Sequence, residues 1–220
     1  MIYIYLSYSF KNLQPIYGDR ANINIKAVKS ILKEDSSNVY EFTLQNHWGT
    51  HIDAPAHFFK NGKRIADYPT DFWIFSNPEV IEVRLNPREI LMLNESFNNI
   101  KNKVDLLLIK SGWYAFRDED IYVYENPGIH PEVGFYLRER FPNLKAVGID
   151  WISISSYVDR ELGREAHRAF LNPDGINNPV LIIEDMNLSK DLNRLSAVWA
   201  FPLIIDEIDS APCTVVGVLE

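Results

Sequence analysis

Cysteine is nearly absent from this sequence, and so are long apolar runs and any surplus of positive charge. The single cysteine, Cys213, excludes an internal disulfide framework and indicates no oxidising compartment. No run reaches the 18 or so apolar residues of a membrane span, and residues 1–10 lack the basic region of a signal peptide. With 22 Lys and Arg against 30 Asp and Glu, the net charge is −8. We therefore expect a cytoplasmic protein that binds neither nucleic acid nor membranes.

The chain is large enough for one well-buried core and small for two. Its 220 residues are 46% hydrophobic and 24% charged, so we predict a single domain over residues 1–220. Apolar or alternating runs predict strands at residues 2–6, 22–31, 38–46, 79–85, 104–110, 145–149, 180–183, 196–205 and 212–219. Helices are predicted at residues 131–141 and 161–171. The sequence is thus expected to form many strands and few helices.

Three of the five histidines lie within the eleven residues HWGTHIDAPAH, which run from His47 to His57. A helix is disfavoured here because the segment contains a glycine and a proline, with β-branched residues between them. On an extended path, His51 and Asp53 point to the same side, and turns would bring His47 and His57 back toward them. Imidazoles with a carboxylate suit Zn²⁺ or a neighbouring first-row metal. The segment therefore predicts a metal site.

The segment resembles the H-x-G-T-H-x-D-x-P-x-H-F signature of the metal-dependent cyclase family, which includes bacterial-type arylformamidases (kynurenine formamidases) and isatin hydrolases. The similarity extends from about residue 14 to the C-terminus and includes GIDWISIS at 148–155, EDMNLSKDL at 184–192 and DSAP at 209–212. The resemblance implies an α/β fold, a swivelling β/β/α domain with a mixed sheet core and few helices. It also implies a homodimer or homotetramer.

The resemblance implies that a helix histidine and a strand-end glutamate complete the metal site, and His167 and Glu184 match these roles. Glu184 directly follows four aliphatic residues, and a buried carboxylate needs a compensating cation. With His47, His51 and Asp53 this gives five ligands, too many for one four-coordinate metal with an open position. We therefore expect two divalent metals per chain, bridged by Asp53 and Glu184. Zinc is the expected metal and manganese the alternative, and the ligands also suit Fe²⁺ and Co²⁺.

Three further residues have open roles. His57 is assigned to acid–base catalysis by the resemblance and by the ordinary pKa of imidazole, with a metal-ligand role as the alternative. Tyr17 lies in a Tyr-Gly-Asp segment similar to the Trp-Pro-Gly-Asp segment whose aromatic residue contacts substrate in arylformamidases; a surface loop is the alternative. Asp150, at a predicted strand end, either orients a ligand histidine or caps the strand.

These features predict a metal-dependent hydrolase of a small amide, in which metal-activated water attacks the carbonyl and a histidine transfers the proton. The resemblance implies N-formylkynurenine or a related aryl formamide as the substrate, and an isatin-type lactam as the alternative. Tyr17 stands where arylformamidases have tryptophan, which weakens the case for the aryl formamide. A non-catalytic metal-binding protein is a second alternative, but it requires no proton-transfer residue, whereas this sequence offers His57 beyond a full ligand set.

Overall fold

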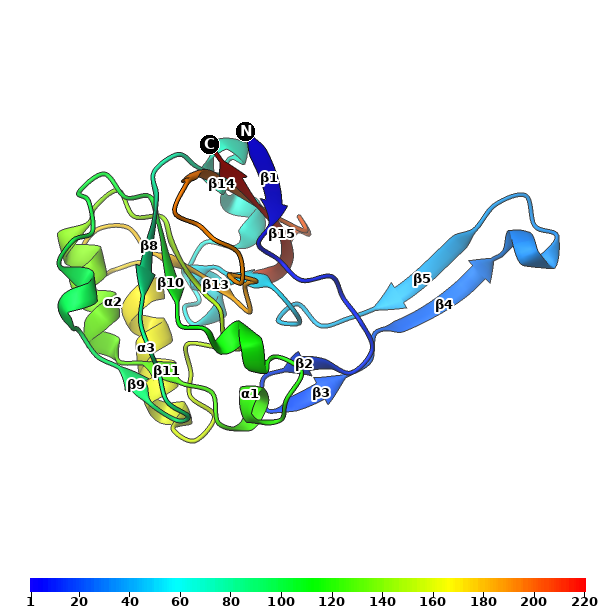
Figure 1. Cartoon of the computed structure of the whole chain (residues 1–220). Helices are drawn as coiled ribbons and strands as arrows, with labels where there is room; N and C mark the ends of the chain where they lie inside the picture. Colours follow the sequence, from blue (N-terminus) through cyan, green and yellow to red (C-terminus); the bar gives the residue numbers. More distant parts are fainter.

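Nine strands form one mixed sheet that carries the rest of the chain (Figure 1). The computed structural model describes all 220 residues. Across the sheet the order is β7 (Ile74–Phe75), β14 (Leu195–Pro202), β15 (Ser210–Leu219), β6 (His51–Asp53), β13 (Leu181–Glu184), β12 (Ala146–Ile149), β10 (Leu106–Lys110) and β8 (Pro78–Glu82). The ninth strand, β1 (Ile2–Tyr5), pairs with β15.

The sheet has a parallel half and an antiparallel half. Strands β8, β10, β12 and β13 run parallel to one another. From β13 through β6, β15 and β14 to β7, every pairing is antiparallel. Because β14 also lies against β8, the sheet curls until it is nearly closed. The short strand β6 lies where the two halves meet.

Strands β10, β12 and β13 are buried on both faces, which explains their nearly continuous apolar sequences. In β10, Leu107 and Ile109 point into the core beneath the helices, whereas Leu106 and Leu108 point into a second core inside the curved sheet. The first core is covered by α2 (Pro131–Arg140) and α3 (Arg160–Leu171), which lie side by side against the sheet (Figure 1).

Helix α3 carries one of the predicted site residues into the molecule. Its N-terminus is capped by Asp159, whose carboxylate accepts a hydrogen bond from the Leu162 amide at 3.1 Å. Its buried residues include Gly163, Ala166, His167 and Phe170, the i, i+3, i+4, i+7 spacing of one helix face. His167 therefore points toward the sheet rather than into solvent.

The remaining elements are short or peripheral. They comprise the strand pair β2 (Gln14–Ile16) and β3 (Asp19–Ala21), the strand pair β9 (Ile90–Leu91) and β11 (Gly128–Ile129), the hairpin β4 (Asn24–Lys29) and β5 (Val39–Thr43), and helix α1 (Ile121–Tyr124). The β4–β5 hairpin extends away from the rest of the molecule (Figure 1). No helix is long and apolar enough to cross a membrane.

The structure confirms the expected α/β class with a mixed sheet and only three α-helices. The nine strands and two helices that the sequence predicts are all present, within a few residues at each end, and the structure adds several short strands. Tyr17 and Gly18 form the tight turn between β2 and β3, where Gly18 has φ +77°. This turn is compatible with the expected contact between Tyr17 and substrate, because a residue in a hairpin turn can point into a pocket.

Candidate metal centre

Strand β6 places two of the predicted ligands at the centre of the sheet. His51 and Asp53 point to one side, while Ile52 between them packs in the core inside the sheet. On the neighbouring strand β13, Glu184 lies directly opposite His51. All three polar side chains are almost completely buried, with 1 to 4% of their surface exposed. The extended path predicted for this segment is thus confirmed at β6.

Two carboxylates and two imidazoles face one another across this centre. Asp53 Oδ1 lies 3.6 Å from His51 Nε2, and Asp53 Oδ2 lies 3.7 Å from His167 Nε2. Glu184 Oε2 lies 3.5 Å from His51 Nε2, and Glu184 Oε1 lies 3.6 Å from His167 Nε2. These separations are long for hydrogen bonds but close to the ~3.4 Å edge of a tetrahedron with metal–ligand bonds of about 2.1 Å.

The other nitrogen of each buried imidazole is held by the backbone. His51 Nδ1 lies 2.8 Å from the Gly49 carbonyl oxygen, and His167 Nδ1 lies 2.8 Å from the Gly163 carbonyl oxygen. Because a carbonyl only accepts, each Nδ1 donates, so the neutral imidazole presents the lone pair of Nε2 to the carboxylates. This is the tautomer that metal-binding histidines need.

Asp53 Oδ1 is buried and makes no well-aligned hydrogen bond, and its one nearby donor is His47 Nδ1 at 3.1 Å. A buried carboxylate oxygen supported so weakly by donors is unfavourable, so the arrangement fits a cation close to it. Glu184 is better supported, since its Oε1 accepts hydrogen bonds from Ser153 Oγ at 2.9 Å and the Ile154 amide at 2.7 Å. The donor set therefore fits a divalent metal ion.

His47 and His57 lie on the more open side of the centre. The rings are 4.2 Å apart, and His47 Nδ1 is 3.1 Å from Asp53 Oδ1. With Asp53 these histidines form a second group of potential metal donors. Burial lowers the pKa of His47, but the carboxylates of Asp53 and Asp209 outweigh it and raise the value to about 10. The strong negative potential behind this shift favours any cation at the same place.

Asp209 contacts both histidines and was not singled out by sequence. Its Oδ2 lies 2.7 Å from His57 Nδ1 and 3.8 Å from His47 Nε2. Hydrogen bonds with His47 and His57 hold the pKa of Asp209 well below its usual range, so the side chain is a carboxylate. Asn46 Nδ2 donates to the other oxygen at 2.9 Å. The resemblance of DSAP at 209–212 to the family could have pointed to Asp209.

Asp150 does not reach the histidines. Its carboxylate accepts hydrogen bonds from the Ser111 amide and hydroxyl, at 2.9 and 2.5 Å, and from the Gly112 amide at 2.9 Å. It therefore caps the turn after β10, which is the second of the two roles that the sequence left open. Ser153 and Ser155 of the adjacent segment do reach the centre, and Ser155 Oγ lies 3.4 Å from His167 Nδ1.

A pocket of about 240 Å³ opens onto the centre. All seven residues that the sequence selected line it, together with four others: Tyr17, His47, His51, Asp53, His57, His167 and Glu184, joined by Phe58, Ile152, Ser153 and Ser155. Burial raises the pKa of Tyr17 to about 12, so its hydroxyl is neutral, and it donates to the Ser156 carbonyl oxygen at 3.1 Å. The pocket thus combines donors for metal with aromatic walls.

Comparison with known proteins places this site in a family. The Cyclase family model matches residues 4–156. A kynurenine formamidase of Bacillus cereus is 29% identical over 182 residues, which cover 82% of this chain and 80% of that protein. Isatin hydrolase A of Ralstonia solanacearum has a similar fold, with a TM-score of 0.74, 16% identity, and coverage of 100% of this chain and 92% of that one.

A further structure, described as a predicted metal-dependent hydrolase from Bacillus stearothermophilus, also has a TM-score of 0.74. It is 20% identical, and the match covers 98% of this chain and 97% of that one. These likenesses show the same fold. The sequence relatives support a hydrolase, and because the family model matches well over half of the chain, the protein belongs to the Cyclase family.

Proposed function

We propose that this protein is a metal-dependent hydrolase of a small amide, with N-formylkynurenine or a related aryl formamide as substrate. The observation that carries the proposal is the cluster in which Asp53 and Glu184 each face His51 and His167 at 3.5 to 3.7 Å. The sequence similarity to kynurenine formamidase supports the choice of reaction.

In this proposal His51, Asp53, His167 and Glu184 hold one divalent ion. His47, whose Nδ1 lies 3.1 Å from Asp53 Oδ1, would help to hold a second ion. Zinc suits these nitrogen and oxygen ligands, and manganese is the alternative. When bound, the metal would polarise the amide carbonyl and supply nucleophilic water at neutral pH.

His57 is the proposed acid–base residue. Asp209 Oδ2 binds its Nδ1 at 2.7 Å, which orients the ring and leaves Nε2 as the nitrogen that exchanges a proton with the substrate. Hydrolysis of a formamide breaks the C–N bond, forms a new C–O bond and moves one proton of water onto the leaving nitrogen. An imidazole at the edge of the pocket is suited to carry that proton.

The walls of the pocket favour an aromatic substrate. Tyr17 and Phe58 present rings to it, and Ile152 adds an apolar surface. These side chains can stack against an aryl ring while the polar centre faces the amide. The volume of about 240 Å³ suits a small molecule.

The proposal is tested by elemental analysis of the purified protein and by hydrolysis assays on N-formylkynurenine and on isatin, before and after chelation. We expect close to two metals per chain and turnover of the formamide that chelation abolishes and added Zn²⁺ or Mn²⁺ restores. Hydrolysis of isatin but not of the formamide would mean that the substrate is a lactam. If the purified protein contained no metal and hydrolysed neither compound, even after metal was added, the proposal of a metal-dependent hydrolase would be wrong.

The variant His57→Ala separates an enzyme from a protein that only binds metal. The enzyme should keep its metal and lose about 10²- to 10⁴-fold in kcat, the usual contribution of general acid–base catalysis. Undiminished turnover would remove His57 from the proposed chemistry.

A further inference from the structure

Both aromatic walls of the pocket over the metal centre are contacted by an arginine of α3. The guanidinium of Arg160 lies 5.8 Å from the centre of the Tyr17 ring and 4.4 Å from that of the Tyr157 ring. The guanidinium of Arg168 lies 5.6 Å from the centre of the Phe58 ring. Because Tyr17 and Phe58 are the two residues with phenyl rings that line the pocket, positive charge lies behind each of its aromatic walls.

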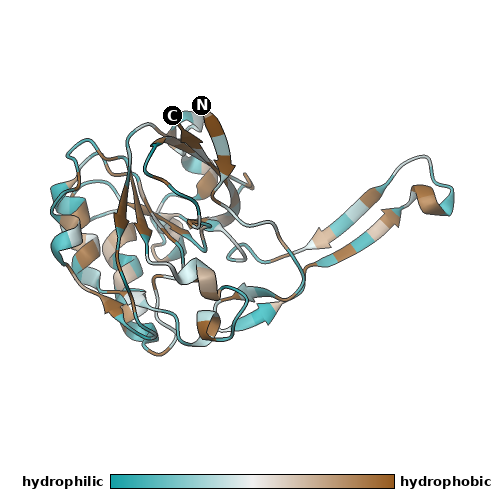
Figure 2. Ribbon diagram, viewed as in Figure 1, coloured by the Kyte–Doolittle hydropathy of each residue, from teal (hydrophilic) through white to brown (hydrophobic).

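The helix places both arginines close to His167. Arg160 precedes His167 by seven residues, almost two turns, so their side chains leave the helix in nearly the same direction, about 10 Å apart along its axis. Arg168 directly follows His167, and the Phe58 ring that it contacts also stacks on the His167 imidazole, with the ring centres 4.9 Å apart. As a helix with one buried face should, α3 contains both hydrophobic and hydrophilic residues along its length (Figure 2). The two positive charges therefore border the pocket that leads to the metal centre.

Neither arginine is neutralised within the chain. Both side chains are exposed, and neither forms an ion pair or a side-chain hydrogen bond. Arg164, which lies between them on the helix, is instead paired with Glu161. A guanidinium that contacts an aromatic ring uses its face, and the N–H donors at its edge stay available. Arg160 and Arg168 can therefore still bind an anion.

This local positive charge is opposite in sign to the charge of the whole chain. The net charge is −8, and Asp53 and Glu184 add two carboxylates at the bottom of the pocket. Such a protein repels an anionic substrate unless positive charge lies along its approach. Arginine suits that purpose, because its planar guanidinium binds a carboxylate through two parallel N–H···O hydrogen bonds.

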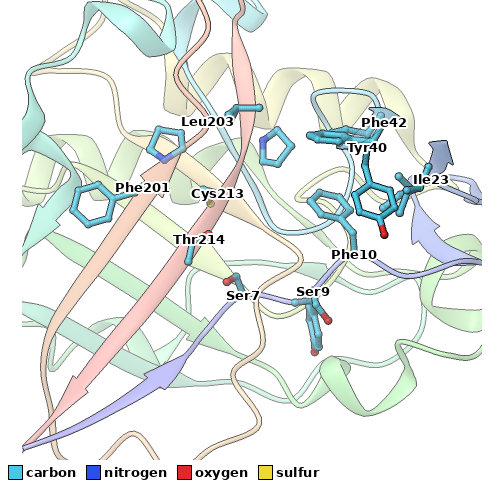
Figure 3. Close-up of a pocket in the computed structure, with 15 residues that line it drawn as sticks. Ser7, Ser9, Phe10, Ile23, Tyr40, Phe42, Phe201, Leu203, Cys213 and Thr214 are labelled. Atoms are coloured by element: carbon cyan, nitrogen blue, oxygen red, sulfur yellow. The ribbon is translucent and has the colours of Figure 1, made fainter. Parts of the chain in front are cut away.

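A larger groove elsewhere on the molecule offers nothing comparable to an anion. It has a volume of about 930 Å³ and lies between the β4–β5 hairpin and the end of β14 (Figure 3). Its lining is mainly apolar, with Tyr40, Phe42, Phe201 and Leu203 among its residues, and includes no charged side chain and no metal donor of the centre. A charged group on the substrate would therefore be held beside α3 rather than in this groove.

We propose that Arg160 is a specificity-determining residue that binds a carboxylate on the substrate, and that Arg168 adds to the positive potential that attracts it. The inference rests on the proposed function, since it concerns the end of the substrate remote from the amide. The amide faces the metal centre, the aryl ring lies against Tyr17 and Phe58, and the carboxylate reaches Arg160. The substrate class is thus an aryl formamide with an acidic side chain, whereas a neutral lactam lacks the group that Arg160 recognises.

The test is isothermal titration calorimetry of the metal-loaded protein with benzoylpropionate, an aryl ketone acid without a formamide, and with its neutral methyl ester. Wild type should bind the acid at least tenfold more tightly than the ester, and Arg160→Gln should lose most of that difference. Arg168→Gln should weaken binding of the acid by about threefold, an effect that about 0.5 M salt should remove because it acts through charge at longer range.

The matched control is Arg140→Gln, which removes an exposed arginine 5.5 Å from the ring centre of Phe141, a residue outside the pocket. This variant should bind the acid as wild type does. Arg160→Lys keeps the charge without the two-bond geometry and should recover part of the affinity. Equal binding of acid and ester by wild type would overturn the proposal. An Arg160→Gln variant that binds the acid as tightly as wild type would also overturn it, because the metal centre would then hold the carboxylate.

Hydrolysis of N-formylkynurenine and of its methyl ester separates this inference from the proposed function. The ratio of kcat/KM for the acid to that for the ester should fall at least tenfold in Arg160→Gln, mainly through KM, because Arg160 contacts no reacting atom. If wild type hydrolysed neither compound but bound benzoylpropionate through Arg160, the proposed function would be wrong and the carboxylate site would stand. If it hydrolysed both equally well and Arg160→Gln left their ratio unchanged, the proposed function would stand and this inference would be wrong.

Discussion

Asp209 Oδ2 lies 2.7 Å from Nδ1 of His57, although 152 positions separate the two residues in the sequence. Asp209 is itself fixed, since Asn46 Nδ2 donates to its other oxygen at 2.9 Å. The carboxylate therefore selects the tautomer of His57 in which Nδ1 carries the proton. In the proposed reaction Asp209 would therefore act through His57, as a positioning residue.

We predict that Asp209→Asn lowers kcat by about 10²- to 10⁴-fold, because an amide can present its NH₂ group to Nδ1 and favour the wrong tautomer. Metal content should stay as in wild type. The control is Asp206→Asn, an exposed carboxylate in the same loop. Kinetics together with elemental analysis checks this, and a loss of metal equal to the loss of turnover would reassign Asp209 to the ligand set.

Asp53→Asn is expected to remove metal binding. The substitution neutralises the carboxylate that faces His47, His51 and His167, so the affinity should fall at least 100-fold. A metal that binds only the folded protein raises the free energy of unfolding with the logarithm of the free metal concentration divided by Kd. Added Zn²⁺ should therefore raise the Tm of wild type and leave that of Asp53→Asn unchanged in differential scanning fluorimetry. An equal rise in both proteins would contradict the proposed role of Asp53.

A buried ion pair next to the centre is expected to support stability. Arg117 binds Asp185 with Nε at 2.8 Å and Nη2 at 2.6 Å, and both side chains are almost completely buried. Arg117→Met leaves the Asp185 charge without its partner, which should cost about 3–5 kcal/mol of unfolding free energy. The comparison is Arg88→Met, whose exposed pair with Glu125 should contribute less than about 1 kcal/mol. Urea unfolding of both variants in chelator measures the difference.

The same pair should affect the metal. Asp185 has φ +52° and directly follows Glu184, and its carbonyl oxygen accepts a hydrogen bond from Thr50, the residue before His51. Releasing Asp185 therefore loosens both strands that present ligands. We expect Arg117→Met to bind metal at least tenfold more weakly, as measured by competition with a chelating dye, whereas Arg88→Met should bind as wild type does.

Gly163→Ala is predicted to displace helix α3. A Cβ at this position would lie 2.7 Å from Ser155 Cα, a backbone atom that cannot swing away. Alanine normally stabilises a helix interior, but here overpacking should destabilise the protein by about 1–3 kcal/mol. Because the Gly163 carbonyl holds His167, metal affinity should fall as well. Arg164→Ala, on the exposed side of the same helix, is the control for both measurements.

Much of the fold could be read from the sequence because burial leaves a local signal. The apolar runs of β10, β12 and β13 reflect burial on both faces, and the spacing of α3 reflects one buried face. The alternation at residues 22–31 and 38–46 correctly predicted a strand pair. It did not indicate that the pair extends away from the body, because alternation shows that one face is apolar without showing what covers it.

The site was predictable where its residues are close in sequence or follow a conspicuous apolar run. His47, His51, Asp53 and His57 share one segment, and Glu184 ends a buried strand. Asp209 was missed although the DSAP resemblance includes it, because an acidic residue in a polar loop does not by itself indicate a role. Only the pairing of β15 with β6 brings that loop to the histidines. Asp150 illustrates the reverse, since a strand-end carboxylate has the same sequence signal whether it caps a turn or supports a ligand.

Strand β6 is only three residues long, yet it is the hydrogen-bonded link between the parallel and antiparallel halves of the sheet. The residues that fasten these halves, His51 and Asp53, are also the proposed centre of the chemistry. Folding yield and turnover are therefore expected to decline together under substitution in this strand.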